Sequence, residues 1–591
     1  MVGFLLVVVF GAVSGVLSLG LATGDELRPF FLLYLKEPTL LLLNIAPVVL
    51  LHLIVYMIFG RPWFSFLVAT AAVFTLGYAE GAKINTAGDV IWLSDVFSGE
   101  FLQYIDDPSK IHLDLLAIGC LIYLVAVTAL LFVMFLRRRS PWFWGRMILL
   151  AVLIAGGFFG YRYIRGSEAF AELSVYKEQD PAPEHVEYAA RGFWLPLMLS
   201  AENRNDIEPP GGYSAGTAKE MLSRYEKEDI LQERAVSLIV IQLEAFEDFS
   251  YTNAAGVDFK SAYADYEYIK GQSAFGRLAS DADPSDDVLT ARQVLTGYSS
   301  VGAIREKTGS FVWYLRAQGY QTKGIQTCSR WLSGRGRINS CLGFEEFRYT
   351  GSGIEAQGLG DSSWPDSDWY LYAEVYDMWR KGLEEGKDRQ FIFAASTQGH
   401  APYETVSLKY GSFTDGITGP AAAELSNYLG CVKDSFYYIR NMLERMEEAE
   451  EPVAVLIYSD HRPALEVSYE ALGIDPSAGD ASSQLDAHST RYLVWANSAA
   501  KKILGTDLKG DTGYVSSEHL MAMFFGLLGY KGPEMMQASH ELMQDLPVTL
   551  SSGICAGRDG SVYAEGVPLE LQSRLYDLRY MQYYEQTNFR Y

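Results

Sequence analysis

Five long apolar segments within the first 165 residues constrain the architecture of this chain more than any other feature. Most of them approach the roughly 20 residues that a membrane-spanning helix needs, so residues 1–165 are predicted to form a multi-span α-helical membrane domain. The first segment has no basic leader and is too long for the core of a signal peptide, so we interpret it as a span. The predicted spans are Val2–Leu21, Leu40–Phe59, Trp63–Leu76, His112–Leu136 and Met147–Tyr163.

A cluster of arginines sets the expected orientation of these spans. Arg137, Arg138, Arg139 and Arg146 flank the loop between the fourth and the fifth span, and loops rich in Lys and Arg stay on the cytoplasmic side. The fifth span then carries the chain outward. We therefore expect a multi-pass protein of the cell membrane in which everything after about Arg165 is extracellular.

The pattern changes after the last span. Residues 166–233 are mixed and charged, and we interpret them as a connecting helix and a linker. From residue 234 to residue 591, short apolar runs alternate with longer amphipathic segments, which predicts an α/β domain with a mostly parallel sheet covered by helices on both faces. The predicted strands are Val236–Gln242, Gln321–Gln326, Gln390–Ser396, Val453–Tyr458 and Arg491–Ala496, and the predicted helices are Asp286–Leu295, Gly309–Gln318, Asp366–Glu384, Ala421–Met446 and Ser516–Leu528.

Acidic and imidazole side chains follow two of the predicted buried strands. Glu244 comes directly after the first strand, and Asp460 and His461 come directly after Val453–Tyr458. Open α/β sheets place their ligands at the carboxyl ends of such strands. Two carboxylates and one imidazole suit a divalent metal of the Mn, Mg or Zn type better than soft thiolate chemistry. The sequence therefore predicts a single metal site at Glu244, Asp460 and His461.

Charge and cysteine content exclude two other classes of protein. The formal net charge is −24, and a nucleic-acid partner would need a basic surface. The chain has 5 cysteines, too few for a disulfide scaffold in a domain of this length. Cys328 and Cys341 are placed to pair, but scattered free thiols are the preferred interpretation.

Ser285 stands at the start of a predicted helix, where its hydroxyl has two possible roles. In the first, it is a simple N-cap that accepts from the free amides of the first turn. In the second, it binds the metal and acts as a nucleophile, because a helix N-terminus also holds a phosphoryl group on its exposed N–H donors. The sequence of this segment leaves both roles open.

Arg335 and His400 lie in loops that suit contacts with an anionic substrate. Arg335 lies in a glycine-rich loop, from which a guanidinium can grip a phosphate with its forked donors. His400 follows a predicted strand and can bond a substrate oxygen or act as an acid or base. Either side chain is as readily an ordinary solvated group.

These motifs together resemble the lipoteichoic acid synthases, the polyglycerol-phosphate polymerases of Gram-positive bacteria in the alkaline phosphatase and sulfatase superfamily. The resemblance covers nearly the whole chain: five spans, a linker and an outer sulfatase-like domain. The segments that carry it are Ile241–Phe246, Ser285–Gly297, Leu342–Phe347, Gln398–Tyr403 and Tyr458–His461.

The resemblance implies a role for each of these residues. Glu244, Asp460 and His461 would hold one manganese ion, and Arg335 and His400 would contact the glycerophosphate.

The chain departs from the family at two positions. The family's nucleophilic threonine aligns on or beside Pro284, so Ser285 is the nearest hydroxyl, with Ser280 and Thr290 as alternatives. A family histidine that precedes the substrate arginine aligns with Gln326.

The implied activity is transfer of glycerophosphate from phosphatidylglycerol to a glycolipid or polymer acceptor at the outer face of the membrane, in lipoteichoic acid synthesis. One alternative is another phosphoryl- or sulfuryl-ester transferase or hydrolase of the same superfamily. The other is a catalytically silent relative that binds a wall polymer, which the two departures favour.

Overall fold

A computed structural model of the chain describes residues 2–24, 27–87, 90–98, 101, 114–136, 143–165, 173–175, 184–200, 207–282, 288–302, 304, 306–327, 335–349, 368–401, 403, 409–465, 467–474, 479–564 and 566–590. The chain forms two compact units. The first consists of residues 1–204 with residues 330–337, and the second consists of residues 205–329 with residues 338–591.

Within the described residues, the first unit contains five helices that are long and apolar enough to cross a membrane, as the sequence predicted. The third of these helices is longer than the predicted span Trp63–Leu76, because small and weakly polar residues continue the helix beyond the apolar run. The five helices are α1 (Val2–Ala22), α3 (Pro38–Phe59), α4 (Pro62–Ala87), α6 (Leu115–Phe135) and α7 (Phe143–Arg165). Shorter helices of this unit are α2 (Arg28–Tyr34), α5 (Leu93–Ser98), α9 (Glu184–Ala190) and α10 (Trp194–Leu199).

Polar side chains inside the helix bundle pair with one another. The Nε2 atom of His52 on α3 lies 2.9 Å from the hydroxyl of Thr70 on α4, which in turn lies 3.1 Å from the hydroxyl of Ser14 on α1. These three side chains are buried. Because an unpaired polar group is costly in hydrocarbon, this chain of contacts ties α1, α3 and α4 together.

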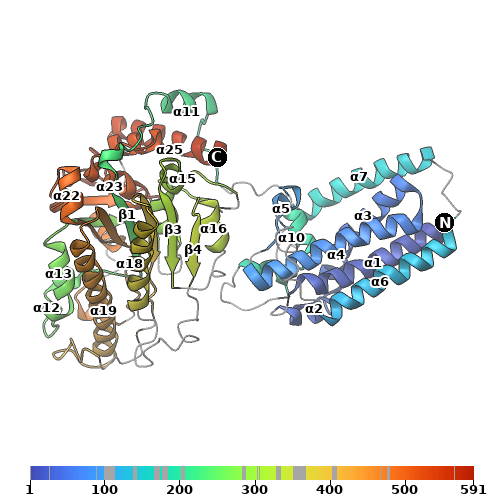
Figure 1. Cartoon of the computed structure of the whole chain (residues 1–591), viewed down its shortest axis with the longest axis horizontal. Helices are drawn as coiled ribbons and strands as arrows, with labels where there is room; N and C mark the ends of the chain where they lie inside the picture. The colour runs from blue at the N-terminus through green and yellow to red at the C-terminus, as the bar shows by residue number, and fades with distance from the viewer. Residues whose placement is uncertain are drawn as a thin grey trace. The chain divides into compact units, whose positions relative to one another are not determined.

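The second unit is built on a sheet of eight strands in the order β4-β3-β5-β1-β6-β7-β2-β8. Figure 1 labels β1, β3 and β4 of this sheet. Only β7 among these strands runs against its neighbours, so the prediction of a mostly parallel sheet is confirmed. The strands are β1 (Ser237–Leu243), β2 (Ala274–Ala279), β3 (Gln321–Gln326), β4 (Glu346–Tyr349), β5 (Gln390–Ala395), β6 (Val453–Ser459), β7 (Ser489–Ala496) and β8 (Gly510–Ser516). A small second sheet contains β9 (Val548–Thr549), β10 (Cys555–Ala556) and β11 (Val562–Tyr563).

Two apolar cores cover the two faces of the large sheet. On β1, Leu238 and Val240 belong to one core, whereas Ile239, Ile241 and Leu243 belong to the other. Alternate side chains of a strand point to opposite faces, and a continuous apolar run therefore marks a strand that is buried on both sides.

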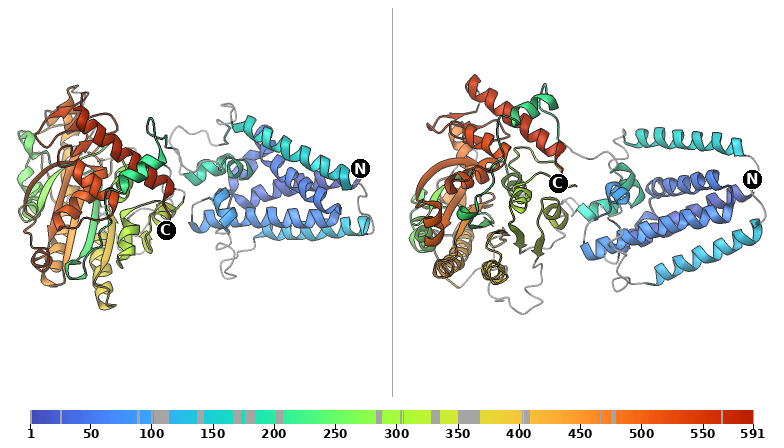
Figure 2. Two further views of the ribbon diagram at one scale, coloured as in Figure 1. Left: turned by 90° about the horizontal axis from the view of Figure 1, so that it is seen from above. Right: turned by 45° about the horizontal axis from the view of Figure 1, so that its top comes forward.

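The helices of this unit are shown around the sheet in Figures 1 and 2. They are α11 (Ala215–Leu222), α12 (Phe259–Ala262), α13 (Ala264–Lys270), α14 (Leu289–Thr296), α15 (Phe311–Ala317), α18 (Trp369–Glu384), α19 (Pro420–Glu448), α20 (Ser468–Ala471), α21 (Ala481–Ala487), α22 (Ser498–Leu504), α23 (Leu520–Leu528), α24 (Glu534–Leu542) and α25 (Leu569–Asn588). The helix α16 (Arg335–Cys341) is divided, with residues 335–337 in the first unit and residues 338–341 in the second.

Three strands of the large sheet were not predicted from the sequence. β2 contains a glycine and an arginine, β8 has few apolar side chains, and β4 has only four residues. Because β8 and β4 are the edge strands, one side of each lacks a partner strand, and neither needs a continuous apolar run. No disulfide joins two cysteines of the described residues, and Cys328 lies outside these residues.

Candidate metal centre

Glu244 occupies the turn that follows the central strand β1. Its backbone amide donates to the hydroxyl of Ser396, at the end of β5, over 2.8 Å. The next residue, Ala245, has a φ of 51°, a left-handed conformation that costs an L-residue about 1 kcal/mol. The Ala245 amide then donates to the Oδ1 atom of Asp460 over 3.0 Å. These contacts fix the direction in which Glu244 leaves the strand.

Asp460 and His461 follow β6, which pairs in parallel with β1. Leu243 lies opposite Ser459 in this pairing, so Glu244 and Asp460 leave adjacent strands at the same edge of the sheet. Asp460 is held firmly: its Oδ1 atom also accepts from the His461 amide over 2.7 Å, and its Oδ2 atom accepts from the Gln242 side chain over 3.1 Å.

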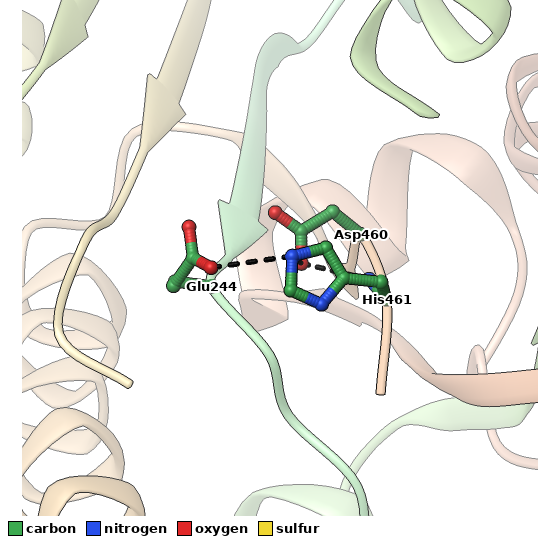
Figure 3. A group of neighbouring side chains, drawn as sticks. All are labelled: Glu244, Asp460 and His461. Atoms are coloured by element: carbon green, nitrogen blue, oxygen red, sulfur yellow. Dashed lines mark hydrogen bonds and ion pairs between the residues drawn. The ribbon is translucent and has the colours of Figure 1, made fainter. Parts of the chain in front are cut away.

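The three predicted ligands converge in one buried cluster (Figure 3). Glu244, Asp460 and His461 are 6%, 0% and 5% exposed, and each offers one ligand atom within 4.8 Å of the other two. The Nε2 atom of His461 lies 3.3 Å from the Oε1 atom of Glu244 and 3.9 Å from the Oδ1 atom of Asp460.

Two buried atoms in this cluster have no hydrogen-bond partner among the described residues, namely Glu244 Oε1 and His461 Nε2. Buried polar atoms are normally satisfied, so two such atoms 3.3 Å apart suit a shared cation between them, either a proton or a metal ion. The two carboxylates and the imidazole therefore fit a divalent metal ion.

A second contact of His461 sets its tautomer. Its Nδ1 atom lies 2.9 Å from the carbonyl oxygen of Arg462, which can only accept a hydrogen bond. Nδ1 therefore carries a proton, and the lone pair of the neutral imidazole is on Nε2, facing the carboxylates. Metal-ligating histidines are oriented in this way by a contact on the other ring nitrogen.

The cluster strongly perturbs proton binding. Burial, followed by the neighbouring Glu244 carboxylate, raises the pKa of Asp460 to about 7. Burial lowers the pKa of the His461 imidazole, but the Asp460 and Glu244 carboxylates outweigh this effect and raise it to about 10. The negative charge of the two carboxylates thus favours binding of a proton at this site, and a bound metal ion would neutralise the same charge.

The segment that carries His400 approaches Glu244 closely. Gly399, with a φ of 124°, leaves only 2.5 Å between the position of a Cβ atom and the carbonyl oxygen of Glu244, so a larger residue would not fit there. His400 is exposed, next to this contact. Arg335 is buried at the first residue of α16, in the connection after β3. The substrate roles of both residues remain predictions.

The three candidate hydroxyls differ in what the structure reveals about them. Ser285 lies outside the described residues. The Thr290 hydroxyl donates to the backbone carbonyl of Asp460 over 2.9 Å, and it lies 2.7 Å from the hydroxyl of Ser280. The Ser280 hydroxyl also accepts from the Ala282 amide. Ser280 and Thr290 are thus buried and tied to the backbone beside the metal ligands.

Sequence reasoning missed the side chains that support the ligands. Ser396 and Ser459 each end an apolar strand, and their hydroxyls accept from the amides of Glu244 and Phe246 over 2.8 and 2.6 Å. Buried Asp368 accepts from the amides of Thr397 and Gln398, which lead to His400. The two serines could have been predicted from the sequence, because each places a hydroxyl at the end of an apolar strand. No pattern in the sequence marks Asp368 as a supporting residue.

Residues 287–530 match the family model described as Sulfatase. A putative cyclic beta-1,2-glucan modification protein from Rhizobium meliloti is 26% identical over 260 residues, which cover 41% of this chain and 38% of that protein's length.

Solved structures include two similar domains. The phosphoglycerol transferase GacH of Streptococcus pyogenes is 19% identical, with a TM-score of 0.48, and the match covers 64% of this chain and 94% of that one. The lipoteichoic acid synthase LtaP of Listeria monocytogenes is 14% identical, with a TM-score of 0.44, and the match covers 63% of this chain and 97% of that one.

The segment matched by the family model includes strands β3 to β8 and the ligands Asp460 and His461. After five apolar helices, the chain therefore carries an α/β domain of which residues 287–530 are similar to the family described as Sulfatase.

Proposed function

We propose that this protein is a metal-dependent transferase that moves glycerophosphate from phosphatidylglycerol to an acceptor at the outer face of the membrane. The observation that carries the proposal is the buried cluster of Glu244, Asp460 and His461, with its two unsatisfied ligand atoms, at the edge of a sulfatase-family sheet. The five apolar helices keep such a domain beside a lipid substrate, which raises the effective concentration of that substrate.

The proposed reaction is a displacement at phosphorus. A divalent ion held by these three residues, with manganese as the proposed metal, would lower the pKa of a nucleophilic hydroxyl and neutralise charge on the phosphodiester. The hydroxyl oxygen of Ser285 forms a bond to phosphorus as the bond from phosphorus to the diacylglycerol oxygen breaks. The proton of the serine leaves with the diacylglycerol, and glycerophosphate stays on the protein as an ester.

Ser285 is the preferred nucleophile because the alternatives are already engaged. Thr290 uses its proton to bond the Asp460 carbonyl, and Ser280 is buried against Thr290. Releasing either hydroxyl would break a buried hydrogen bond, at a cost of about 1–3 kcal/mol. Arg335 and His400 are proposed to contact the phosphate oxygens and the glycerol of the substrate.

A second alcohol then completes the transfer. The acceptor hydroxyl attacks phosphorus, and the serine oxygen leaves with its proton restored. The proposed acceptor is a glycolipid or a growing polymer. The name of the Rhizobium meliloti relative supports an acceptor built of sugars.

A silent, polymer-binding relative is the alternative favoured by a specific observation. Pro284 and Gln326 stand where the resembled family has its nucleophilic threonine and a histidine. A catalytically inactive relative of this kind would keep the metal cluster and the fold, but it would form no covalent ester with the substrate.

Lipid turnover by the full chain in detergent with saturating manganese tests the proposal. We expect diacylglycerol release from fluorescent phosphatidylglycerol and a glycerophosphate ester that mass spectrometry maps to Ser285. Ser285→Ala should abolish both signals and leave metal content unchanged. Preferential turnover of phosphatidylethanolamine would indicate a different transferase of the superfamily. Metal binding without turnover of either lipid would favour the silent relative.

A further inference from the structure

A cavity of about 410 Å³ lies in the second unit, lined by the 207–211 segment, the loop after α14, Ser551 and the helix α25. Its volume is within the range of small-molecule sites, and none of its lining residues is a metal ligand. We propose that this cavity binds a singly phosphorylated sugar or polyol. The proposal goes beyond the proposed function and does not depend on it.

The guanidinium of Arg579 is the group that points to an anion. Arg579 is half-buried and lines the cavity, and no hydrogen bond joins it to the described residues, although its charge lies near enough to the buried Glu518 carboxylate to lower that group's pKa. Its Nε atom is buried without an acceptor. A buried charged donor without an acceptor destabilises the protein, and the two parallel N–H groups of an arginine match the oxygens of a phosphate.

Hydroxyl groups line the same cavity. They include those of Ser300, Ser551, Tyr576 and Tyr583, and the first three of these residues are exposed. Each can donate to a phosphate oxygen and can also accept from a sugar hydroxyl. A bare anion would leave most of them unused, whereas a phosphorylated polyol would engage both the guanidinium and the hydroxyls.

Two glutamines hold one wall of the cavity in place. Gln582 donates to the carbonyl of Gly297 over 2.8 Å and accepts from the hydroxyl of Ser299 over 2.9 Å. One turn further along α25, Gln586 donates to the carbonyl of Ser300 over 3.0 Å. Because these amides are already used, they shape the cavity in advance, which lowers the entropic cost of binding.

The charge of the lining limits how many phosphates fit. Arg579 is the one basic residue that lines the cavity, and the exposed carboxylate of Glu208 lies at its boundary. A ligand with several phosphates would lack counter-charges and would be repelled by Glu208. A single phosphate attached to a hydroxylated carrier meets both limits.

Ser551, another lining residue, is tied to the segment that precedes the candidate nucleophile. The backbone amide of Ser551 donates to the Oδ2 atom of Asp281 over 2.8 Å, and Asp281 follows Ser280. The Ser280 hydroxyl contacts the hydroxyl of Thr290, which donates to the carbonyl of Asp460. A ligand that contacts Ser551 is therefore connected to the metal centre through a short series of hydrogen bonds.

Calorimetric titration of the full chain in detergent tests the site, with metals removed by a chelator so that the metal centre does not bind phosphate. The probes are glucose 1-phosphate, inorganic phosphate and glucose. We expect glucose 1-phosphate to bind most tightly, phosphate more weakly, and glucose below detection. Arg579→Gln should weaken binding of glucose 1-phosphate by about tenfold or more, and Tyr583→Phe should weaken it less.

Arg574→Gln is the matched control on the same helix, because Arg574 is paired with Asp545 and does not line the cavity. This variant and Asp460→Asn should bind the probe as the natural chain does. Absence of binding to the chelated natural chain would overturn the proposal. It would also be overturned if Arg579→Gln changed nothing, or if Arg574→Gln or Asp460→Asn caused the same loss. Lipid turnover is measured separately with manganese, so the two proposals fail independently.

Discussion

At the scale of single residues, the metal centre depends on two buried atoms that face one another, Glu244 Oε1 and His461 Nε2. Asp460 completes the cluster and also binds the Ala245 amide, so it supports the turn as well as the ion. Removing one of three ligands should therefore abolish tight binding rather than weaken it slightly.

We expect Asp460→Ala to lose most of its metal, because both a ligand oxygen and a support of the Glu244 turn disappear. Elemental analysis of the purified chain should find about one divalent ion per natural chain, since the described residues contain one such cluster. Glu470→Ala, at an exposed acidic residue, is the control and should keep its ion. Full metal content in Asp460→Ala would refute the site.

Metal affinity should rise with pH. The metal-free site holds a proton at His461 below a pKa of about 10, and Asp460 is also protonated below a pKa of about 7. An incoming ion must displace these protons, so the affinity should rise more steeply below pH 7 than between pH 7 and pH 10. Titration in two buffers of different ionisation enthalpy measures the protons released. An affinity that does not change from pH 6 to pH 9 would contradict this picture.

The sequence was informative about these residues for a physical reason. Glu244, Asp460 and His461 follow directly from buried strands, and parallel strands bring their carboxyl ends to one edge. Ser396, Ser459 and Asp368 support them through contacts between segments far apart in the chain, as for Glu244 and Ser396. No local pattern encodes such pairs, so they appear only in three dimensions.

At the scale of secondary-structure elements, the antiparallel strand β7 is anchored to the turn after β1. Arg491 on β7 lies 2.8 Å from the carboxylate of Glu247, which is buried. Burial raises the pKa of Glu247, and the nearby Arg491 is the first of the charges that oppose this effect. The ion pair thus connects the turn that carries Glu244 to β7, the strand beyond β6.

Arg491→Met should destabilise the second unit by about 3–5 kcal/mol, since it leaves the Glu247 charge buried without its partner. The midpoint of urea unfolding of the full chain, followed by near-ultraviolet circular dichroism, measures the effect. Adding Glu247→Gln should recover a large part of the loss. Arg574→Met, which removes a more exposed pair with Asp545, should cost no more than about 1 kcal/mol. Equal losses in the two single variants would contradict the proposed anchor.

Elements differ in how well the sequence predicts them. The central strands β1, β5 and β6 are buried throughout and read as uninterrupted apolar runs. β8 is exposed along much of its length, so its composition is that of a loop. β2 is short and contains Gly276, which lies against β7 and β8 where the carbonyl of Gly513 leaves no room for a side chain. Its pairing, rather than its composition, makes it a strand.

At the scale of the whole molecule, the five apolar helices and the arginine-flanked loop after α6 predict which side of the membrane the second unit occupies. We expect a single cysteine at Ser174, in a chain without its native cysteines, to react with a membrane-impermeant thiol reagent in whole cells. A cysteine at Ser140, between the fourth and the fifth apolar segments of the sequence, should react only after lysis. The reverse pattern would overturn the orientation.

The distance along the chain between the metal ligands has a consequence for biogenesis. Ala245 and Asp460, which share a hydrogen bond in the metal centre, are 215 residues apart. A growing chain that has completed β1 still lacks two of its three ligands, and it gains them only when β6 has been synthesised and has paired with β1. If the second unit is exported as we propose, it folds after translocation and selects its ion from the cell exterior. The identity of the bound metal would then report the composition of the growth medium rather than that of the cytoplasm.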